Sequence, residues 1–61
     1  MQYNLNFLYE SGEILVANVS GKKSQMLAVI KADNSIEYIK QNLPTKVKNQ
    51  IELEANNRVN Y

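Results

Sequence analysis

The feature that most constrains the fold is a change of hydrophobic period near residue 33. Residues 2–9 alternate strictly between two sides, and one side carries Tyr3, Leu5, Phe7 and Tyr9. Such alternation is typical of a β-strand. Residues 13–19 and 24–31 are rich in branched and apolar side chains and predict two further strands. Beyond residue 33 the apolar positions recur every three or four residues, so we expect helices to follow the strands.

Two polar segments separate the predicted strands. Residues 10–13 read Glu-Ser-Gly-Glu and predict a tight turn in which Gly12 adopts positive φ. Residues 20–23 read Ser-Gly-Lys-Lys, and Gly21 at the first central position suits a type II′ hairpin. Two-residue loops would pair Tyr9 with Ile14, Phe7 with Val16, Val16 with Leu27 and Ile14 with Val29. The first half of the chain therefore predicts a three-stranded antiparallel meander.

The second half predicts two short helices. Asn34 followed by Glu37 resembles a capping box, and an apolar stripe follows at Ile36, Ile39, Leu43, Val47, Ile51, Ala55 and Val59. Inside a helix Pro44 would cost about 3 kcal/mol, but a first turn tolerates it. We therefore expect helices over residues 35–42 and 45–57 and a frayed tail over 58–61. The alternation of residues 51, 53 and 55 leaves a fourth strand over 50–55 as the alternative.

Both faces of the predicted sheet are apolar. One face, called here the aromatic face, carries Tyr3, Leu5, Phe7, Tyr9, Ile14, Val16, Leu27 and Val29. The opposite face carries Leu8, Leu15, Ala17, Val19, Met26, Ala28 and Ile30. One helical stripe covers one face, and the other would expose several hundred Å² of apolar surface, which a monomer rarely tolerates. Alternatives are that the helices wrap further around the sheet, or that the strands curl into a small barrel.

We expect the helices to take the face with Ala17 and Ala28, because small side chains allow close approach. The aromatic face, whose eight residues are those given above, is then the predicted protein interface, since aromatic residues are enriched in interfaces. Leu53 and Tyr61 lie off the helical stripe and are candidates to extend the predicted interface. The expected partner is a second copy, because two-fold dimers are the commonest closed assembly. A bulge or a three-residue loop would exchange the faces beyond that point.

The composition excludes most catalytic and metal chemistry. The chain has 61 residues with no Cys and no His, which removes the usual nucleophilic triads and zinc, haem and iron–sulfur sites. Glu10 and Glu13 flank a turn, where we expect them to be solvated rather than catalytic. Residues 20–24 resemble the end of a phosphate-binding loop, but they lack its first glycine and lead into a strand. We expect a single domain over residues 1–61 with no enzymatic activity, cofactor or metal.

The net charge of +1 argues against a strongly basic nucleic-acid scaffold. The alternative function is a small nucleic-acid-binding regulator that uses Lys22, Lys23 and Lys31. Apolar runs of at most five residues predict no membrane span, and the N-terminal residues lack a signal-peptide pattern, so we expect a cytoplasmic protein. A small, Asn-rich reading frame without cofactors suits a phage or mobile-element inhibitor of a larger host protein.

Overall fold

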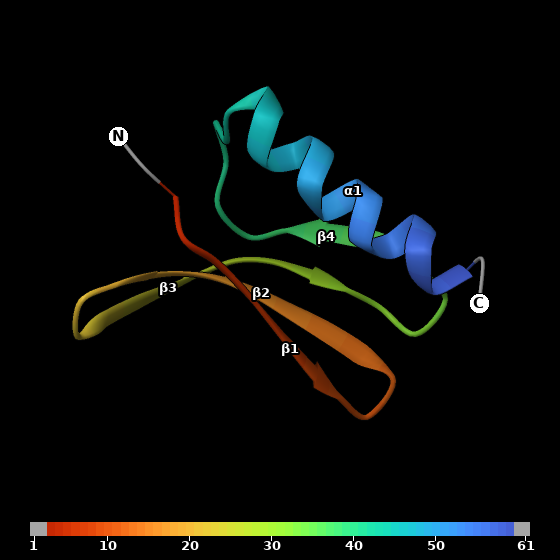
Figure 1. The fold of residues 1–61 in the computed structure, drawn as a ribbon. Coiled ribbons are helices and arrows are strands. Elements are labelled where there is room, and N and C mark those ends of the chain that lie inside the picture. Colours follow the sequence, from red (N-terminus) through yellow and green to blue (C-terminus); the bar gives the residue numbers. More distant parts are fainter. Residues whose placement is uncertain (1–2, 60–61) are drawn as a thin grey trace.

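A computed structural model describes residues 3–59 and shows one open sheet with a single helix on one side (Figure 1). The elements are β1 (Leu5–Glu10), β2 (Glu13–Ser20), β3 (Lys23–Ile30), β4 (Ile36–Tyr38) and α1 (Thr45–Val59). The sheet has the order β1-β2-β3-β4, and each strand is antiparallel to its neighbours. The α+β class is therefore confirmed, whereas the prediction of three strands and two helices is wrong.

Both predicted hairpins have two-residue loops. Glu10 pairs with Glu13 across the first, where Ser11 and Gly12 have φ values of 53° and 81°. Two positive φ angles define a type I′ turn, whose twist matches that of the strands. Gly21 has φ 62° in the second loop, as a type II′ turn requires at that position. The predicted pairs Tyr9–Ile14 and Phe7–Val16 are confirmed.

A β-bulge changes the register between β2 and β3. Ala17 pairs with Met26, but Val16 pairs with Ala28, so Leu27 is the extra residue on β3. The predicted pairs Val16–Leu27 and Ile14–Val29 are therefore wrong, and Ile14 pairs with Ile30. Because side chains alternate with period two, one extra residue moves the rest of the strand to the opposite face.

A hairpin turn replaces the predicted start of a helix at residue 35. Asn34, with φ 72°, donates its backbone N–H to the Lys31 carbonyl (2.8 Å), and Lys31 N–H donates to the Ser35 carbonyl (2.8 Å). Asp33 Oδ1 accepts from the Ser35 amide (3.0 Å) and from Ser35 Oγ (2.7 Å), and these bonds lower the pKa of Asp33. A three-residue loop ending in a left-handed residue is a hairpin connection. The predicted capping box at Asn34 is wrong.

Strand β4 occupies the middle of the predicted helix 35–42. Ile36 pairs with Ile30 and Tyr38 with Ala28, and the amides of Ile39 and Lys40 both donate to the Leu27 carbonyl (2.8 and 3.0 Å). A helix of two turns is marginal by itself, because nucleation fixes several residues for one hydrogen bond. Pairing instead satisfies the backbone groups along the edge of β3. The edge of β3 therefore determines the structure of this segment.

The second predicted helix is confirmed from its first residue. The carbonyl of Pro44 accepts from the amides of Val47 (3.0 Å) and Lys48 (3.1 Å), so the proline precedes the helix and its missing N–H breaks no helical bond. The alternative strand over 50–55 is wrong, and α1 extends through Val59 into the tail predicted to fray. Residues 60–61, including Tyr61, lie outside the described part. Within that part, no helix is long and apolar enough to cross a membrane.

The core lies between α1 and one face of the sheet. The helix and the segment before it contribute Leu43, Val47, Ile51 and Ala55, and the sheet contributes Ile14, Val16, Leu27, Ala28 and Ile30. Tyr3, Leu5 and Phe7 are partly buried against this cluster. The helix thus covers the aromatic face, and the prediction that it covers the opposite face is wrong. Because of the bulge, Ala28 and Ile30 lie on the helix-covered face.

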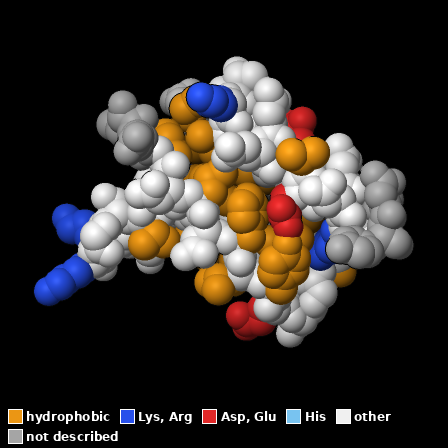
Figure 2. Space-filling model, viewed as in Figure 1, with side chains coloured by type: hydrophobic (Ala, Val, Ile, Leu, Met, Phe, Trp, Pro, Cys, Tyr) orange, Lys and Arg blue, Asp and Glu red, His pale blue; other side chains and the backbone are white. Residues whose placement is uncertain are grey.

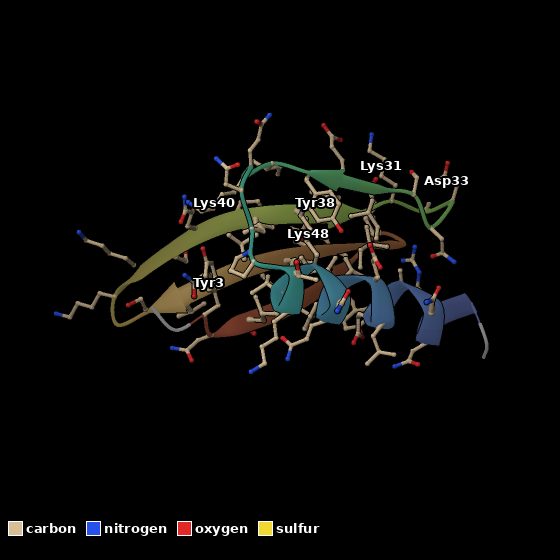
Figure 3. All side chains as sticks on the ribbon, turned by 90° about the horizontal axis from the view of Figure 1, so that it is seen from above. Tyr3, Lys31, Asp33, Tyr38, Lys40 and Lys48 are labelled. Carbon is tan, nitrogen blue, oxygen red and sulfur yellow. The ribbon has the colours of Figure 1, made fainter. Side chains whose placement is uncertain are left out.

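Among the residues that the structure describes, the Tyr38 hydroxyl is the one buried side-chain polar atom without a hydrogen-bond partner. Lys48 Nζ lies 5.7 Å from the centroid of the Tyr38 ring, and Figure 3 shows both residues. Burial, followed by the negative charge of Glu52, raises the pKa of Tyr38 above its ordinary value of 10.0.

Replacing Tyr38 by phenylalanine is expected to raise the free energy of unfolding at pH 7 by about 1 kcal/mol, because an unsatisfied buried hydroxyl is costly. Because the folded state holds the phenol neutral, its pKa there is raised. The folded protein therefore loses stability as the pH rises from about 10, the ordinary pKa of tyrosine, through the folded-state pKa. Tyr38→Phe removes that loss, so alkaline unfolding followed by circular dichroism should begin at higher pH. Lower stability of the variant at pH 7 would contradict this account of the hydroxyl.

Candidate protein interface

The side of the sheet opposite α1 carries a continuous apolar surface, called here the outer face. Its central row is formed by Leu8, Leu15 and Val29, which pair in sequence across β1, β2 and β3. Ala17 and Met26 form the next row, with Val19 beyond them. Ile39 lies just beyond the end of β4 and is not part of the buried core, and we assign its exposed side chain to the edge of the outer face. The outer face therefore comprises Leu8, Leu15, Ala17, Val19, Met26, Val29 and Ile39.

No element covers the outer face within the described residues (Figure 1). Leu8 is 55% exposed, Ile39 51% and Met26 39%, while the remaining four side chains are half-buried by their neighbours in the sheet. Among the described elements, α1 lies on one side of the sheet and no second layer lies on the other.

The eight residues predicted as the interface do not form one exposed surface. Ile14, Val16 and Leu27 have no exposed surface, so a partner cannot reach them. Tyr3, Leu5 and Phe7 are partly buried against the core. Tyr9 is 64% exposed and donates its hydroxyl to Glu54 Oε2 of α1. Of the eight, Val29 alone belongs to the outer face.

Sequence reasoning did identify most outer-face residues as a second apolar face, but it assigned them to the helices. Five of them, Leu8, Leu15, Ala17, Val19 and Met26, belong to the face predicted to lie under the helices. Ile39 was missed because its spacing also fits the helical stripe. No local signal marks the bulge, since residues 26–30 form an uninterrupted apolar run that hides any change of side.

The three lysines predicted to contact nucleic acid do not lie together. Lys22 and Lys23 are exposed at the β2–β3 hairpin, where Figure 2 shows lysine side chains projecting away from the molecule. Lys31 lies beside the β3–β4 turn at the other end of the sheet (Figure 3), with Nζ 3.1 Å from Glu37 Oε1. The hydrogen bond to Glu37 and its negative charge raise the pKa of Lys31. Lys31 is therefore not part of a basic surface with the other two.

Charge is segregated along the strands. Residues 14–32 and 38–51 contain no Asp or Glu, so the end of the sheet at the β2–β3 hairpin has cations alone. Three carboxylates border the opposite end of the outer face. Glu37 pairs with Val29, and Glu10 pairs directly with Glu13 on the same side as Leu8. We call the Lys22–Lys23 hairpin the basic end and the border formed by Glu10, Glu13 and Glu37 the acidic end.

Metal-ligating side chains are not gathered in the described part of the chain. Residues 3–59 contain no cluster of three or more Asp and Glu side chains placed to hold a metal ion. No protein-family description, curated protein or solved structure matches the chain. The outer face, which lies between two oppositely charged ends of the sheet, is the candidate interface of the described chain.

Proposed function

We propose that this protein is a small, non-enzymatic protein-binding module that acts as a homodimer through its outer face. The observation that carries the proposal is that no layer covers this face within residues 3–59. As a result, the apolar side chains of Leu8, Met26 and Ile39 are each more than one-third exposed. An exposed contiguous apolar patch with a polar border is typical of a protein contact. Asn6, Ser24 and Glu37 supply that border beside Ala17, Val19 and Val29.

A second copy is the occupant best matched to this face. A two-fold contact brings the same surface of each copy together, so two outer faces would form a second apolar core between two sheets. Small domains bury a modest fraction of their surface and gain stability from association. The oppositely charged ends of the face also complement each other when two copies meet.

The test is the double substitution Met26→Glu with Ile39→Glu, which places two carboxylates on the outer face. Both side chains are substantially exposed in the single chain, so the fold should tolerate the change. Burying a carboxylate without a partner in an apolar contact is strongly unfavourable. We expect the dissociation constant of the dimer to rise by at least about a hundredfold, measured by sedimentation equilibrium.

The matched control is Leu53→Glu, since Leu53 is 59% exposed on α1, on the opposite side of the sheet from the outer face. This variant should retain the dimer, and circular dichroism should show native secondary structure in both proteins. Unchanged association of the double variant would contradict the proposal, as would dissociation caused equally by Leu53→Glu.

We propose two wider roles beyond the dimer. Inhibition of a larger host protein rests on composition and size, and it would use any surface that the dimer leaves free. Nucleic-acid binding would have to use Lys22 and Lys23 without Lys31, which is engaged with Glu37. The single arginine, Arg58, is also unavailable for base contacts because it bonds to Gly12, Lys31 and Asn34.

A further inference from the structure

We infer that each strand of one copy runs antiparallel to the same strand of its partner, so that the basic end of each sheet meets the acidic end of the other. In this arrangement Lys22 and Lys23 of one copy approach Glu10 and Glu13 of its partner, twice per dimer. The inference rests on the proposed dimer and adds its orientation and the residues that select the partner. It follows from three observations on the single chain.

The first observation is that the acidic end contains an unfavourable contact. Glu10 and Glu13 are direct cross-strand partners, and like charges placed opposite each other destabilise a sheet. Neither carboxylate forms a direct ion pair in the described part of the chain, although the charge of Glu13 acts on Lys31 and Arg58 is bonded to Gly12 in the turn between them. A cation supplied by another copy would relieve this repulsion.

The second observation is that the basic end has the matching charges. Lys22 and Lys23 are both exposed at a hairpin tip, and neither forms an ion pair within the described residues. Lys22 lies in the loop, whereas Lys23 is opposite Ser20 and starts from the α1 side of the sheet, so its long side chain must reach around the end of the hairpin. The nearest acidic positions in sequence are Glu13, at the far end of β2, and Asp33, in the turn that follows β3. The two lysines therefore have charge to contribute to a partner and little opposing charge nearby.

The third observation is geometric. β2 and β3 each contain eight residues and so extend for about 26 Å, and this length separates the two charged ends. In the aligned class of sheet packing, which we take for this dimer, two stacked sheets keep their strand directions within about 30° of each other, so each end of one sheet lies over one end of the other. The basic end of one sheet lies over the acidic end of the other only when each strand runs antiparallel to the same strand of the partner.

The parallel alternative places like charges together at both ends. The two lysine hairpins would then face each other, and so would the two Glu10–Glu13 pairs. Like-charge contacts disfavour a wrong arrangement more reliably than ion pairs strengthen a correct one. The apolar outer face supplies the attraction in either case, and the charged ends select the orientation.

The experiment compares four proteins. The first is the natural sequence, the second carries Lys22→Glu with Lys23→Glu, the third carries Glu10→Lys with Glu13→Lys, and the fourth carries all four changes. All four proteins keep a like-charge contact across the first hairpin, but Glu10→Lys with Glu13→Lys also places two cations near Arg58 and Lys31, so the stability of each folded chain is measured separately. Dissociation constants are measured by sedimentation at low and high salt, with circular dichroism to verify the fold.

Each double variant is expected to dissociate about tenfold or more readily than the natural protein at low salt, because opposite charges become like charges at both contacts. The fourfold variant restores opposite charges and should regain the natural affinity. The differences should shrink near 1 M salt, where the screening length is about 3 Å.

The outcomes separate the orientation from the dimer itself. If the natural protein dimerises and all four proteins have equal dissociation constants, the antiparallel orientation is overturned while the dimer stands. Loss of affinity in both double variants without recovery in the fourfold variant also overturns it. A natural protein that stays monomeric at every concentration overturns the proposed function instead.

Discussion

Replacing Ile51 with alanine is expected to lower the free energy of unfolding by about 3 kcal/mol, within the range for large-to-small changes in a core. Ile51 is the fully buried residue of the α1 stripe, and the core cluster places it with residues of β2 and β3. A chain of this length has a total stability of about 3–9 kcal/mol. A large share of the molecules should therefore unfold under mild conditions.

Chemical denaturation followed by circular dichroism measures this effect, with Leu53→Ala as the control. Leu53 lies two residues away on the same helix and is 59% exposed, so its truncation should change stability by less than about 0.5 kcal/mol. Because dimer formation adds to apparent stability, both variants are compared at the same protein concentration. Equal stability of the two variants would mean that α1 does not pack as described.

Replacing Arg58 with methionine is expected to lower the free energy of unfolding by about 2 kcal/mol, since it removes charge-assisted hydrogen bonds. Arg58 donates to the Gly12 carbonyl (2.6 Å), to Asn34 Oδ1 (2.8 Å) and to the Lys31 carbonyl. These contacts join the last turn of α1 to two loops of the sheet. A positive charge at the C-terminal end of a helix is also favourable.

Amide hydrogen exchange in the last turn of α1 and in the β3–β4 turn reports directly on this connection. Exchange should accelerate at both places in Arg58→Met. Arg58→Lys keeps the charge and the aliphatic stem but not the planar donor group, so its stability should be intermediate. If residues 58–61 were a frayed tail, as the sequence suggested, Arg58→Met would have no effect on stability or exchange.

The local structure was predictable wherever one short-range rule applied. The turns at Ser11–Gly12 and Gly21–Lys22 follow from glycine positions, and the start of α1 follows from Pro44. The fourth strand was not predictable in this way, because the spacing of its apolar residues is ambiguous. Ile36 and Ile39 are spaced as on a helix, whereas Ile36 and Tyr38 are spaced as on a strand. The strand forms because the otherwise unpaired edge of β3 offers hydrogen bonds to this segment, and that edge exists only in the folded sheet.

The candidate site was predictable in kind but not in position. The sequence showed two apolar sheet faces and too little helix to cover both, and the structure has the same imbalance. Which face remains uncovered depends on Leu27, the extra residue of the bulge. A single inserted position exchanges two faces, and nothing in a continuous apolar run identifies that position. Arg58 was missed because its acceptors include two backbone carbonyls, which carry no sequence signal.

The central claim is that the outer face is covered by a second copy of the chain. Sedimentation equilibrium of the natural protein from low to high micromolar concentration tests it most directly. The account predicts a reversible, concentration-dependent mass that approaches twice the 7.0 kDa of one chain, and that falls to the single-chain mass in Met26→Glu with Ile39→Glu. A mass of 7.0 kDa for the natural, folded protein at every concentration would contradict it.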